Sequence, residues 1–403
     1  MRFPEFSGEW EKCKVSELLD FYSTNSLCWE QLEYDTENIS NLHYGLIHVG
    51  LPTMVNFVQD RLPNIKDGNK PKNYELCKEG DVAFADASED TNEVAKAIEF
   101  YNLNGRDVIC GLHTIHGRDN KDRTVVGFKG YAFSSTAFHN QIRRIAQGTK
   151  IYSISTKNFS ECYIGIPSKV EQAKIASLLH LIDERIVTQN KIIEDLKKLK
   201  SAISKHLFAR KDLLETTICL SNIATLKNGY AFQSGKYNAL GKWKILTITN
   251  VPGERYINDE DCNCIINLPN DIQDHQVLKE GDILISLTGN VGRVSLCKNG
   301  DYLLNQRVGL LQLSKNVNRE FLYQILSSQR FENSMIACGQ GAAQMNIGKG
   351  DVESYVLPYS SNGNNILWVA KILHSYDERI INELRRLTLL TMQKQYLLTQ
   401  MFI

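Results

Sequence analysis

One helical phrase occurs twice in this chain, and that repeat restricts the fold more than any other feature. The phrase reads LHLIDERI at 179–186 and LHSYDERI at 373–380. A gapless alignment extends the match from 173–208 onto 367–402, where 10 of 36 positions are identical. Neither segment contains glycine or proline, as an uninterrupted helix requires. The repeat therefore predicts two long helices of common origin.

The apolar residues of both segments predict a coiled-coil seam. They recur at alternating intervals of three and four positions for about four heptads. Two polar residues interrupt each seam at equivalent places: Gln189 and Lys200 in the first copy, Glu383 and Lys394 in the second. Polar residues in a seam fix register and orientation. We predict antiparallel helices in which Lys200 faces Glu383 and Gln189 faces Lys394. The alternative is two unrelated amphipathic helices, each belonging to the domain before it.

The repeat also extends toward the N-terminus of each copy. The tripeptide EGD occurs at 79–81 and at 280–282, and Pro167 and Pro358 introduce the two predicted helices. These landmarks predict two copies of one unit, each made of a globular domain and a long helix. The expected boundaries are 1–166 for the first domain, 167–210 for the central helix, 211–357 for the second domain and 358–403 for the distal helix.

Both globular segments mix strand-like and helix-like patterns. The predicted strands are 125–135, 242–251, 281–287 and 302–313, and the predicted helices are 93–101 and 319–336. We therefore expect an α+β fold. It would consist of two mixed α/β domains related by a pseudo-twofold axis and separated by two long antiparallel coiled-coil helices.

Composition narrows the class of protein. The formal net charge is zero, so any binding to nucleic acid must come from local basic patches. No apolar run is long enough to span a bilayer, and the N-terminus lacks the layout of a signal peptide. We expect a cytoplasmic protein without membrane contact. The ten cysteines form no CxxC pair, so we expect reduced, packed thiols and no zinc ribbon.

A search for catalytic motifs finds none. IGKG at 347–350 lacks the leading glycine and the final hydroxyl of a phosphate-binding loop, and no serine stands in a nucleophile-elbow context. His113 and His116 could form half of a metal site, but a loop or core pair is the favoured interpretation. We therefore expect neither catalytic residues nor a metal in this chain.

Loops rich in amide, hydroxyl and guanidinium groups remain as the candidate functional segments. Arg, Asn and Gln match the edges of guanine and adenine, whereas Lys, Ser and Thr beside glycine suit phosphates. The alternative is ordinary solvated turns. The predicted DNA-binding residues are His113, His116, Arg118, Lys121, Arg123, Arg143, Arg144, Gln147, Thr149 and Lys150 in the first domain, and Tyr230, Gln233, Thr288, Asn290, Arg293, Asn305, Gln306, Arg307, Gln340, Gln344 and Asn346 in the second.

The order of these segments resembles the specificity subunit of type I restriction-modification enzymes. The resemblance covers most of the chain and is carried by FPEFSGEW near the start, IPSKVEQAKIASLLHLIDERI at 166–186, KNGYAFQSGKY at 227–237, EGDILISLTGNVGRV at 280–294, LLNQRVGLL at 303–311 and the distal LHSYDERI. Such a family implies two target-recognition domains, each reading half of an asymmetric, bipartite site in double-stranded DNA. It also implies paired helices that space the domains and dock two methyltransferase subunits.

The same resemblance implies that chemistry belongs to partner subunits. The methyltransferase subunits would use S-adenosylmethionine, and the restriction subunits would use ATP and magnesium, so this chain would bind no cofactor. Three alternatives remain: the similar subunit of a fused restriction-methylation system, a DNA-acting enzyme with its own catalytic site, and a coiled-coil assembly protein without a nucleic-acid role.

Overall fold

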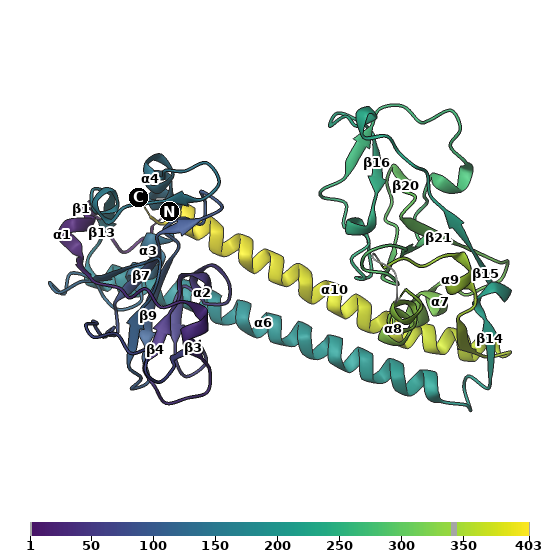
Figure 1. Ribbon diagram of the computed structural model, residues 1–403, viewed down its shortest axis with the longest axis horizontal. Coiled ribbons are helices and arrows are strands. Elements are labelled where there is room, and N and C mark those ends of the chain that lie inside the picture. Colours follow the sequence, from purple (N-terminus) through teal and green to yellow (C-terminus); the bar gives the residue numbers. More distant parts are fainter. Residues whose placement is uncertain (1, 340–344, 403) are drawn as a thin grey trace. The chain divides into compact units, whose positions relative to one another are not determined.

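The computed structural model describes residues 2–339 and 345–402. The chain divides into two compact units, unit 1 (Met1–Asn190 and Arg385–Ile403) and unit 2 (Lys191–Leu384). Both divisions fall inside long helices, α6 (Lys169–Ala209) and α10 (Gly363–Gln400), so each unit contains a segment of both (Figure 1). The two long helices expected from the repeat are confirmed.

Unit 1 is built on two main sheets. Within its described residues, a five-stranded sheet has the order β2-β11-β7-β9-β5 and a four-stranded sheet has the order β10-β4-β6-β3, beside the pairs β1-β13 and β12-β8. The strands are β1 (Glu11–Lys14), β2 (Asp20–Tyr22), β3 (Leu32–Glu33), β4 (Ser40–Leu42), β5 (Met54–Asn56), β6 (Asn64–Ile65), β7 (Val82–Ala85), β8 (Ala87–Ser88), β9 (Ala97–Asn102), β10 (Val108–Cys110), β11 (Thr114–Arg118), β12 (Tyr152–Ser153) and β13 (Tyr163–Ile166). The shorter helices are α1 (Val15–Leu18), α2 (Tyr44–His48), α3 (Phe128–Phe133), α4 (Thr136–Ile145) and α5 (Thr156–Ser160).

Unit 2 has a closely related plan. In the part that the structure describes, a four-stranded sheet has the order β15-β21-β18-β19 and a three-stranded sheet has the order β17-β16-β20, beside the pair β14-β22. The strands are β14 (Thr216–Cys219), β15 (Ala224–Asn228), β16 (Trp243–Leu246), β17 (Asn263–Ile265), β18 (Ile283–Ser286), β19 (Val294–Leu296), β20 (Tyr302–Leu304), β21 (Val308–Leu313) and β22 (Val356–Tyr359). The shorter helices are α7 (Arg319–Leu326), α8 (Gln329–Cys338) and α9 (Lys349–Glu353).

The two units share strand order and the turn that begins the central strand. The order β2-β11-β7-β9 corresponds to β15-β21-β18-β19, and β10 runs parallel to β4 as β20 does to β16. The EGD glycines, Gly80 and Gly281, have φ angles of 85° and 82°, a region that favours glycine. In both turns the aspartate carboxylate, Asp81 or Asp282, accepts the amide of the lysine three residues before it. The repeat therefore includes the globular domains.

Buried apolar residues of the long helices belong to the cores of both units. In unit 1, Leu179 and Ile182 of α6 share a core with Leu397 and Leu398 of α10. In unit 2, Leu207 of α6 packs with the first turns of α10, represented by Val369 and Leu373. Burial of these helix faces stabilises each unit by about 25 cal/mol per Å² of apolar surface removed from water. The helices are thus part of each fold.

The strand and helix predictions hold in unit 2 and fail twice in unit 1. Strands lie within 242–251, 281–287 and 302–313, and helices α7 and α8 cover 319–336, as predicted. The predicted helix at 93–101 is instead largely strand β9, and the predicted strand at 125–135 contains helix α3.

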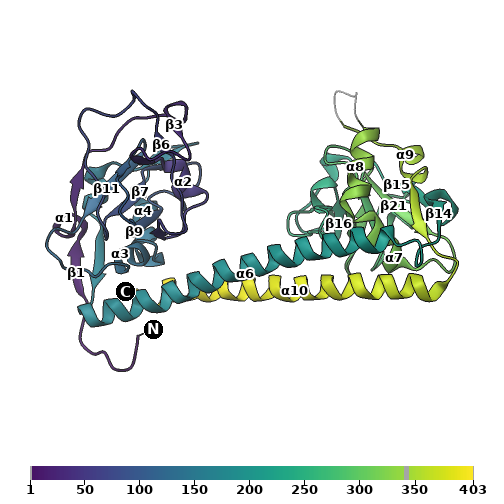
Figure 2. The same ribbon diagram turned by 90° about the horizontal axis from the view of Figure 1, so that it is seen from below.

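One buried carboxylate accounts for both wrong predictions. Glu99 on β9 is fully buried, and its oxygens accept the amides of Gly127 and Gly130 at 2.9 and 2.7 Å, at the N-terminus of α3. A carboxylate at this end of a helix satisfies free amides and complements the helix dipole. Lys129 supplies a buried countercharge to Glu99 at 3.3 Å. Helix α3 packs against β9 (Figure 2). The Tyr131 hydroxyl of α3 donates to Asp183 of α6 at 2.9 Å.

No helix among the described residues is both long enough and apolar enough to cross a membrane.

Candidate nucleic-acid interface

Loops selected from the sequence meet at one end of the β15-β21-β18-β19 sheet of unit 2. The Leu287 amide donates to the Arg307 carbonyl, and the Ile347 amide donates to the Leu287 carbonyl, both at 2.9 Å. Thr288 also forms a β-bridge with Asn346. The sheet therefore brings residues 287–293, 305–307 and 345–347 side by side, and we call this set the second loop edge.

Exposed polar side chains occupy the second loop edge. Asn290, Gln306, Arg307 and Asn346 are exposed, and Thr288 is half-buried. Carboxamide and guanidinium groups have the hydrogen-bonding geometry that matches the edges of adenine and guanine. The structure thus brings together five of the eleven residues predicted for the second domain.

Asn305 has a different place from its neighbours. It is only 6% exposed, and its carboxamide oxygen accepts the amide of Arg307 at 3.1 Å. This local hydrogen bond shapes the turn that presents Gln306 and Arg307. The prediction that Asn305 contacts DNA is therefore corrected: the side chain is committed to its own loop.

Tyr230 and Gln233 extend the second loop edge. The Gln306 amide donates to the Tyr230 carbonyl at 3.0 Å, and the Tyr230 hydroxyl donates to Asp271 at 2.8 Å. Tyr230 and Gln233 line one surface groove together with Phe232. An exposed amide beside an aromatic pair suits a nucleobase chemically.

The remaining predicted residues of the second domain are Arg293, at the end of the 287–293 segment, and two glutamines. Arg293 is half-buried, and its Nε lies 3.6 Å from a carboxylate oxygen of Glu332 on α8. An acidic partner reduces the positive charge that Arg293 could offer to a phosphate. Gln340 and Gln344 lie outside the described residues.

The first domain forms the same loop junction from different residues. The Asp86 amide donates to the His113 carbonyl at 3.1 Å, and the Ile154 amide donates to the Asp86 carbonyl at 2.9 Å. Asp86, His113 and Ile154 thus take the positions of Leu287, Arg307 and Ile347. We call residues 86–90, 111–113 and 147–154 the first loop edge.

His113 is the central side chain of the first loop edge. Its backbone is left-handed, with a φ of 54°, and its side chain is half exposed. Its Nδ1 lies 3.2 Å from a carboxylate oxygen of Asp86. Burial raises the pKa of Asp86, while the neighbouring His113 acts in the opposite direction.

Basic and amide side chains surround the same edge. Gln147, Thr149 and Lys150 are exposed in the loop after α4, and Arg143 and Arg144 are exposed in the last turn of that helix. A β-bridge between Gln147 and Ser153 closes this loop. With His113 and Lys121, these five residues are the exposed members of the predicted set in the first domain.

In each unit, a DERI aspartate binds the opposite long helix. In unit 1, Asp183 accepts the Tyr131 hydroxyl at 2.9 Å, and its other oxygen lies 2.6 Å from Nζ of Lys394. In unit 2, Asp377 accepts Nζ of Lys200 at 2.5 Å. The repeat relates Asp183 to Asp377 and Lys394 to Lys200, so the two ion pairs are equivalent.

Two further donors fix Asp377. The Arg255 guanidinium donates to it at 3.0 Å, and the Gln324 carboxamide donates at 2.5 Å. Arg255 also forms a two-bond pair with Glu320. Burial acts to raise the pKa of Glu320, but the hydrogen bonds from Arg255 and Gln324 hold that pKa below its ordinary value.

The helix segments run antiparallel within each unit. In unit 1, Asp183 pairs with Lys394, and one groove is lined by Gln189, farther along α6, and by Leu389, earlier along α10. In unit 2, the Lys200 pair is followed by a hydrogen bond from Asn365 to the Leu213 carbonyl at 3.0 Å. Within each unit, residue numbers therefore increase along α6 in the direction in which they decrease along α10.

The ion partners of the seam lysines differ from the prediction. Lys200 binds Asp377 and Lys394 binds Asp183, whereas the sequence assigned them Glu383 and Gln189. The axial register of these pairs is therefore six residues away from the predicted one. A lysine side chain is long enough to bind an aspartate that lies outside the seam. The polar residues of the seam were therefore not sufficient to predict the register.

Comparisons with known proteins agree on one family. Residues 215–390 match the family described as type I restriction modification DNA specificity domain. The chain is 30% identical over 213 residues to the type I restriction enzyme MjaVIII specificity subunit of Methanocaldococcus jannaschii, covering 47% of this chain and 49% of that subunit. It is 23% identical over 374 residues to the MjaX specificity subunit of the same organism, covering 88% and 84%.

A solved structure extends the likeness to the whole fold. The type I restriction-modification S subunit from M. genitalium aligns with a TM-score of 0.57 and 16% identity, covering 100% of this chain and 99% of that chain. The chain is similar to type I specificity subunits, in sequence over residues 215–390 and in fold over its length. It spans about half the length of the MjaVIII subunit, 49%, in that alignment.

Four residues of the first domain that were predicted to bind DNA lie away from the first loop edge. His116 and Arg118 are buried, with exposures of 0% and 7%, and both bind the carboxylate of Asp81. The prediction that these two side chains contact DNA is wrong, because β11 directs them into the interior. Lys121 and Arg123 follow the far end of β11 and bind the Glu17 carbonyl and the Glu11 carboxylate.

The aromatic residues that lie near the first loop edge were not identified from the sequence. The ring of Trp29 lies 4.5 Å from that of His43, His43 lies 4.7 Å from Tyr44, and Tyr44 lies 5.2 Å from His113. Trp29 is 45% exposed. Exposed rings beside polar loops offer stacking surfaces to bases. In the sequence they are isolated aromatics without periodicity, and only their shared place in the fold relates them.

Proposed function

We propose that this chain is the non-catalytic, DNA-reading subunit of a type I restriction-modification complex. Each loop edge would read one half of an asymmetric, bipartite site in double-stranded DNA. The observation that carries this proposal is the junction of Asp86, His113 and Ile154, which recurs at Leu287, Arg307 and Ile347 with the same backbone hydrogen bonds.

The difference in side chains at these equivalent positions supports an asymmetric site. His113 in one edge corresponds to Arg307 in the other, and Asp86 corresponds to the apolar Leu287. A guanidinium matches guanine through two parallel hydrogen bonds, whereas a single imidazole cannot make that pair. Equal scaffolds with unlike contact groups would read unlike half-sites.

The long helices support a spacing role within this proposal. Helix α6 contains 41 residues without a break. At a rise of about 1.5 Å per residue it extends for about 60 Å, or about 18 base pairs of B-form DNA. We propose that the paired helices keep the two reading domains at a set separation, so that the bases between the half-sites go unread.

The same helices would dock the catalytic partners. We propose two methyltransferase subunits, which would use S-adenosylmethionine, and restriction subunits, which would use ATP and magnesium. Exposed apolar residues on the long helices, such as Leu181, Leu389 and Met392, offer surface for protein contacts.

Co-expression with the partner methyltransferase, followed by mapping of methylated bases in the host genome, tests the proposal. We expect one bipartite, asymmetric motif with an unread spacer. A single uninterrupted motif would contradict the two-reader arrangement. Methylation or cleavage of DNA by the purified chain alone would favour an enzyme with its own site, and absence of salt-dependent DNA binding by the complex would favour an assembly protein.

A further inference from the structure

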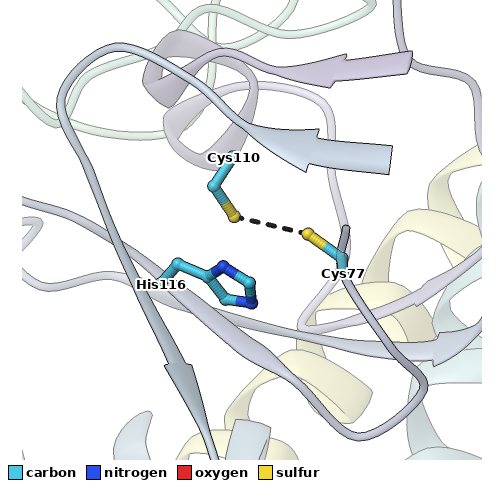
Figure 3. Close-up of side chains that lie close together, drawn as sticks. All are labelled: Cys77, Cys110 and His116. Carbon is cyan, nitrogen blue, oxygen red and sulfur yellow. Dashed lines mark hydrogen bonds between the residues drawn. The ribbon is translucent and has the colours of Figure 1, made fainter. Parts of the chain in front are cut away.

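A buried cluster of two cysteines and a histidine lies in unit 1, apart from the contacts described for DNA reading. Cys77, Cys110 and His116 are 5%, 2% and 0% exposed. One potential ligand atom from each lies within 4.8 Å of the others. Figure 3 shows the two sulfur atoms facing each other and one edge of the His116 ring facing them.

Separate elements bring the three residues together. Cys110 ends β10, whose sheet is β10-β4-β6-β3, and His116 lies in the middle of β11, whose sheet is β2-β11-β7-β9-β5. Cys77 precedes β7, and its amide donates to the carbonyl of Val108 on β10 at 2.8 Å. The cluster therefore joins the two main sheets of the domain at one point.

The distance between the sulfur atoms suits two ligands of one ion. Sγ of Cys77 and Sγ of Cys110 are 3.6 Å apart. A disulfide bond is about 2.05 Å long, so the pair is not covalently joined. Two thiolates at about 2.3 Å from a tetrahedral zinc ion lie about 3.8 Å apart. A shared hydrogen between two thiols also allows 3.6 Å, so the histidine decides between these interpretations.

The histidine has one committed nitrogen and one without a partner. Nε2 of His116 lies 2.7 Å from a carboxylate oxygen of Asp81, and Arg118 donates to both oxygens of that carboxylate. Nδ1 is buried and has no hydrogen-bond partner. When Nε2 donates its proton to Asp81, Nδ1 carries a free lone pair. A carboxylate that orients the far nitrogen in this way is the usual support of a metal-binding histidine.

We propose that Cys77 Sγ, Cys110 Sγ and His116 Nδ1 bind a thiophilic divalent cation, with Zn²⁺ as the expected ion. Three protein ligands leave one tetrahedral position to a water molecule. Binding releases two thiol protons to solvent, and the two thiolates then balance the charge of the ion. The neutral complex makes burial of the ion tolerable.

The ion would hold the backbone beneath the first loop edge. Residues 111–113 are the segment between Cys110 and β11, so two ligands bracket the loop that presents His113. The consequence for DNA reading rests on the proposed function, whereas the binding of the ion does not. The equivalent segment of unit 2 runs from β20 through Asn305 to β21 and contains no cysteine.

Cobalt titration of the full-length chain tests the site. The chain is reduced, freed of metal with a chelator and titrated with Co²⁺ in the absence of DNA. We expect thiolate-to-cobalt charge-transfer absorption that saturates at about one ion per chain and disappears when Zn²⁺ is added. Reduced wild-type chain without this absorption would overturn the proposal, whatever the result of DNA reading.

Variants identify the ligands. Cys77→Ser and Cys110→Ser are expected to lose the charge-transfer absorption, while circular dichroism reports whether each variant is folded. Cys162→Ser is the matched control, because Cys162 is a buried, free cysteine of the same unit, and it should bind cobalt as the wild type does. Absorption that persists in folded Cys77→Ser and Cys110→Ser would contradict the assignment. Should either variant fail to fold, the wild-type titration alone decides.

Discussion

At the scale of single residues, Arg307 and His113 occupy equivalent backbone positions in the two domains. Substitution of each residue therefore tests one half-site separately. Each carbonyl accepts an amide from the residue after the central strand, Leu287 or Asp86. We expect Arg307→Ala to weaken recognition of one half-site by about 1–3 kcal/mol and relax its sequence. His113→Ala should affect the other half. Methylation rates on duplexes with single base changes in each half measure both effects.

The control for Arg307 is an exposed arginine elsewhere in unit 2. Arg330 on α8 is exposed and lies outside the second loop edge, so Arg330→Ala should leave both half-sites unchanged. If Arg307→Ala relaxed both halves equally, the assignment of one edge to one half-site would be wrong.

Asp377 is a buried carboxylate of unit 2 that accepts hydrogen bonds from three side chains. It is 6% exposed and binds Lys200, Arg255 and Gln324. Removal of one partner from a buried ion cluster costs about 3–5 kcal/mol, because the remaining charges lose their compensation. We therefore expect Asp377→Ala to lower the free energy of unfolding by about that amount, measured by urea denaturation.

The neighbour Glu378 provides the control for this measurement. It is half-buried and follows Asp377 in the same helix, so Glu378→Ala should change the free energy of unfolding by less than about 1 kcal/mol. Equal losses for both variants would show that the helix, and not the ion cluster, determines the effect.

At the scale of elements, the local sequence pattern predicted helices and strands correctly where tertiary contacts favour the same structure. The long helices and the strand at 281–287 followed from periodicity alone. Segments 93–101 and 125–135 did not, because Glu99 couples them through hydrogen bonds that no local pattern contains. Likewise, Asp81 holds His116 and Arg118 inside the domain, although their loop-like sequence predicted exposure.

Asp259 connects elements of the smaller sheet in unit 2. Its contacts predict that the stability of this unit decreases at acidic pH. It accepts Lys244 of β16 at 2.8 Å, Lys298 at 2.9 Å and the Tyr302 hydroxyl of β20 at 3.0 Å. The hydrogen bond from Lys244, assisted by Lys298 and Tyr302 and opposed by burial, holds the pKa of Asp259 well below its ordinary value.

The direction of the pH effect follows from this lowered pKa. The stabilising contribution is complete above the ordinary aspartate pKa of about 3.9 and is lost as pH falls through the folded-state pKa. Asp259→Asn should therefore be less stable than the wild type at neutral pH, and the difference should shrink as the pH approaches about 3. Urea midpoints across this range measure it, and a constant difference would contradict the assignment.

At the scale of the whole molecule, the duplication of domain and helix could be inferred from the sequence. The two loop edges could be inferred only in part. Repeated landmarks such as EGD mark equivalent turns, so two related domains with long helices were expected. The loop edges depend on backbone hydrogen bonds across distant segments, which join Asp86 to His113 and Ile154. The aromatic neighbours Trp29 and Tyr44 became recognisable only through that arrangement.

The repeat also determines where the proposed spacer can be lengthened. The divisions between the units follow Asn190 in α6 and Leu384 in α10, which are equivalent positions in the two copies. Insertion of one heptad at both places preserves the apolar seam. Seven residues add about 10 Å of helix, which corresponds to about 3 base pairs.

We therefore expect the double insertion to lengthen the unread spacer of the methylated site by about 3 base pairs and to leave both half-sites unchanged. An insertion in α6 alone is the control. It would lengthen α6 but not α10 between the Asp183–Lys394 pair and the Asp377–Lys200 pair. The two ion pairs could then not both form, so methylation should be lost. An unchanged spacer in a folded, active double-insertion variant would show that the helices do not set the separation of the half-sites.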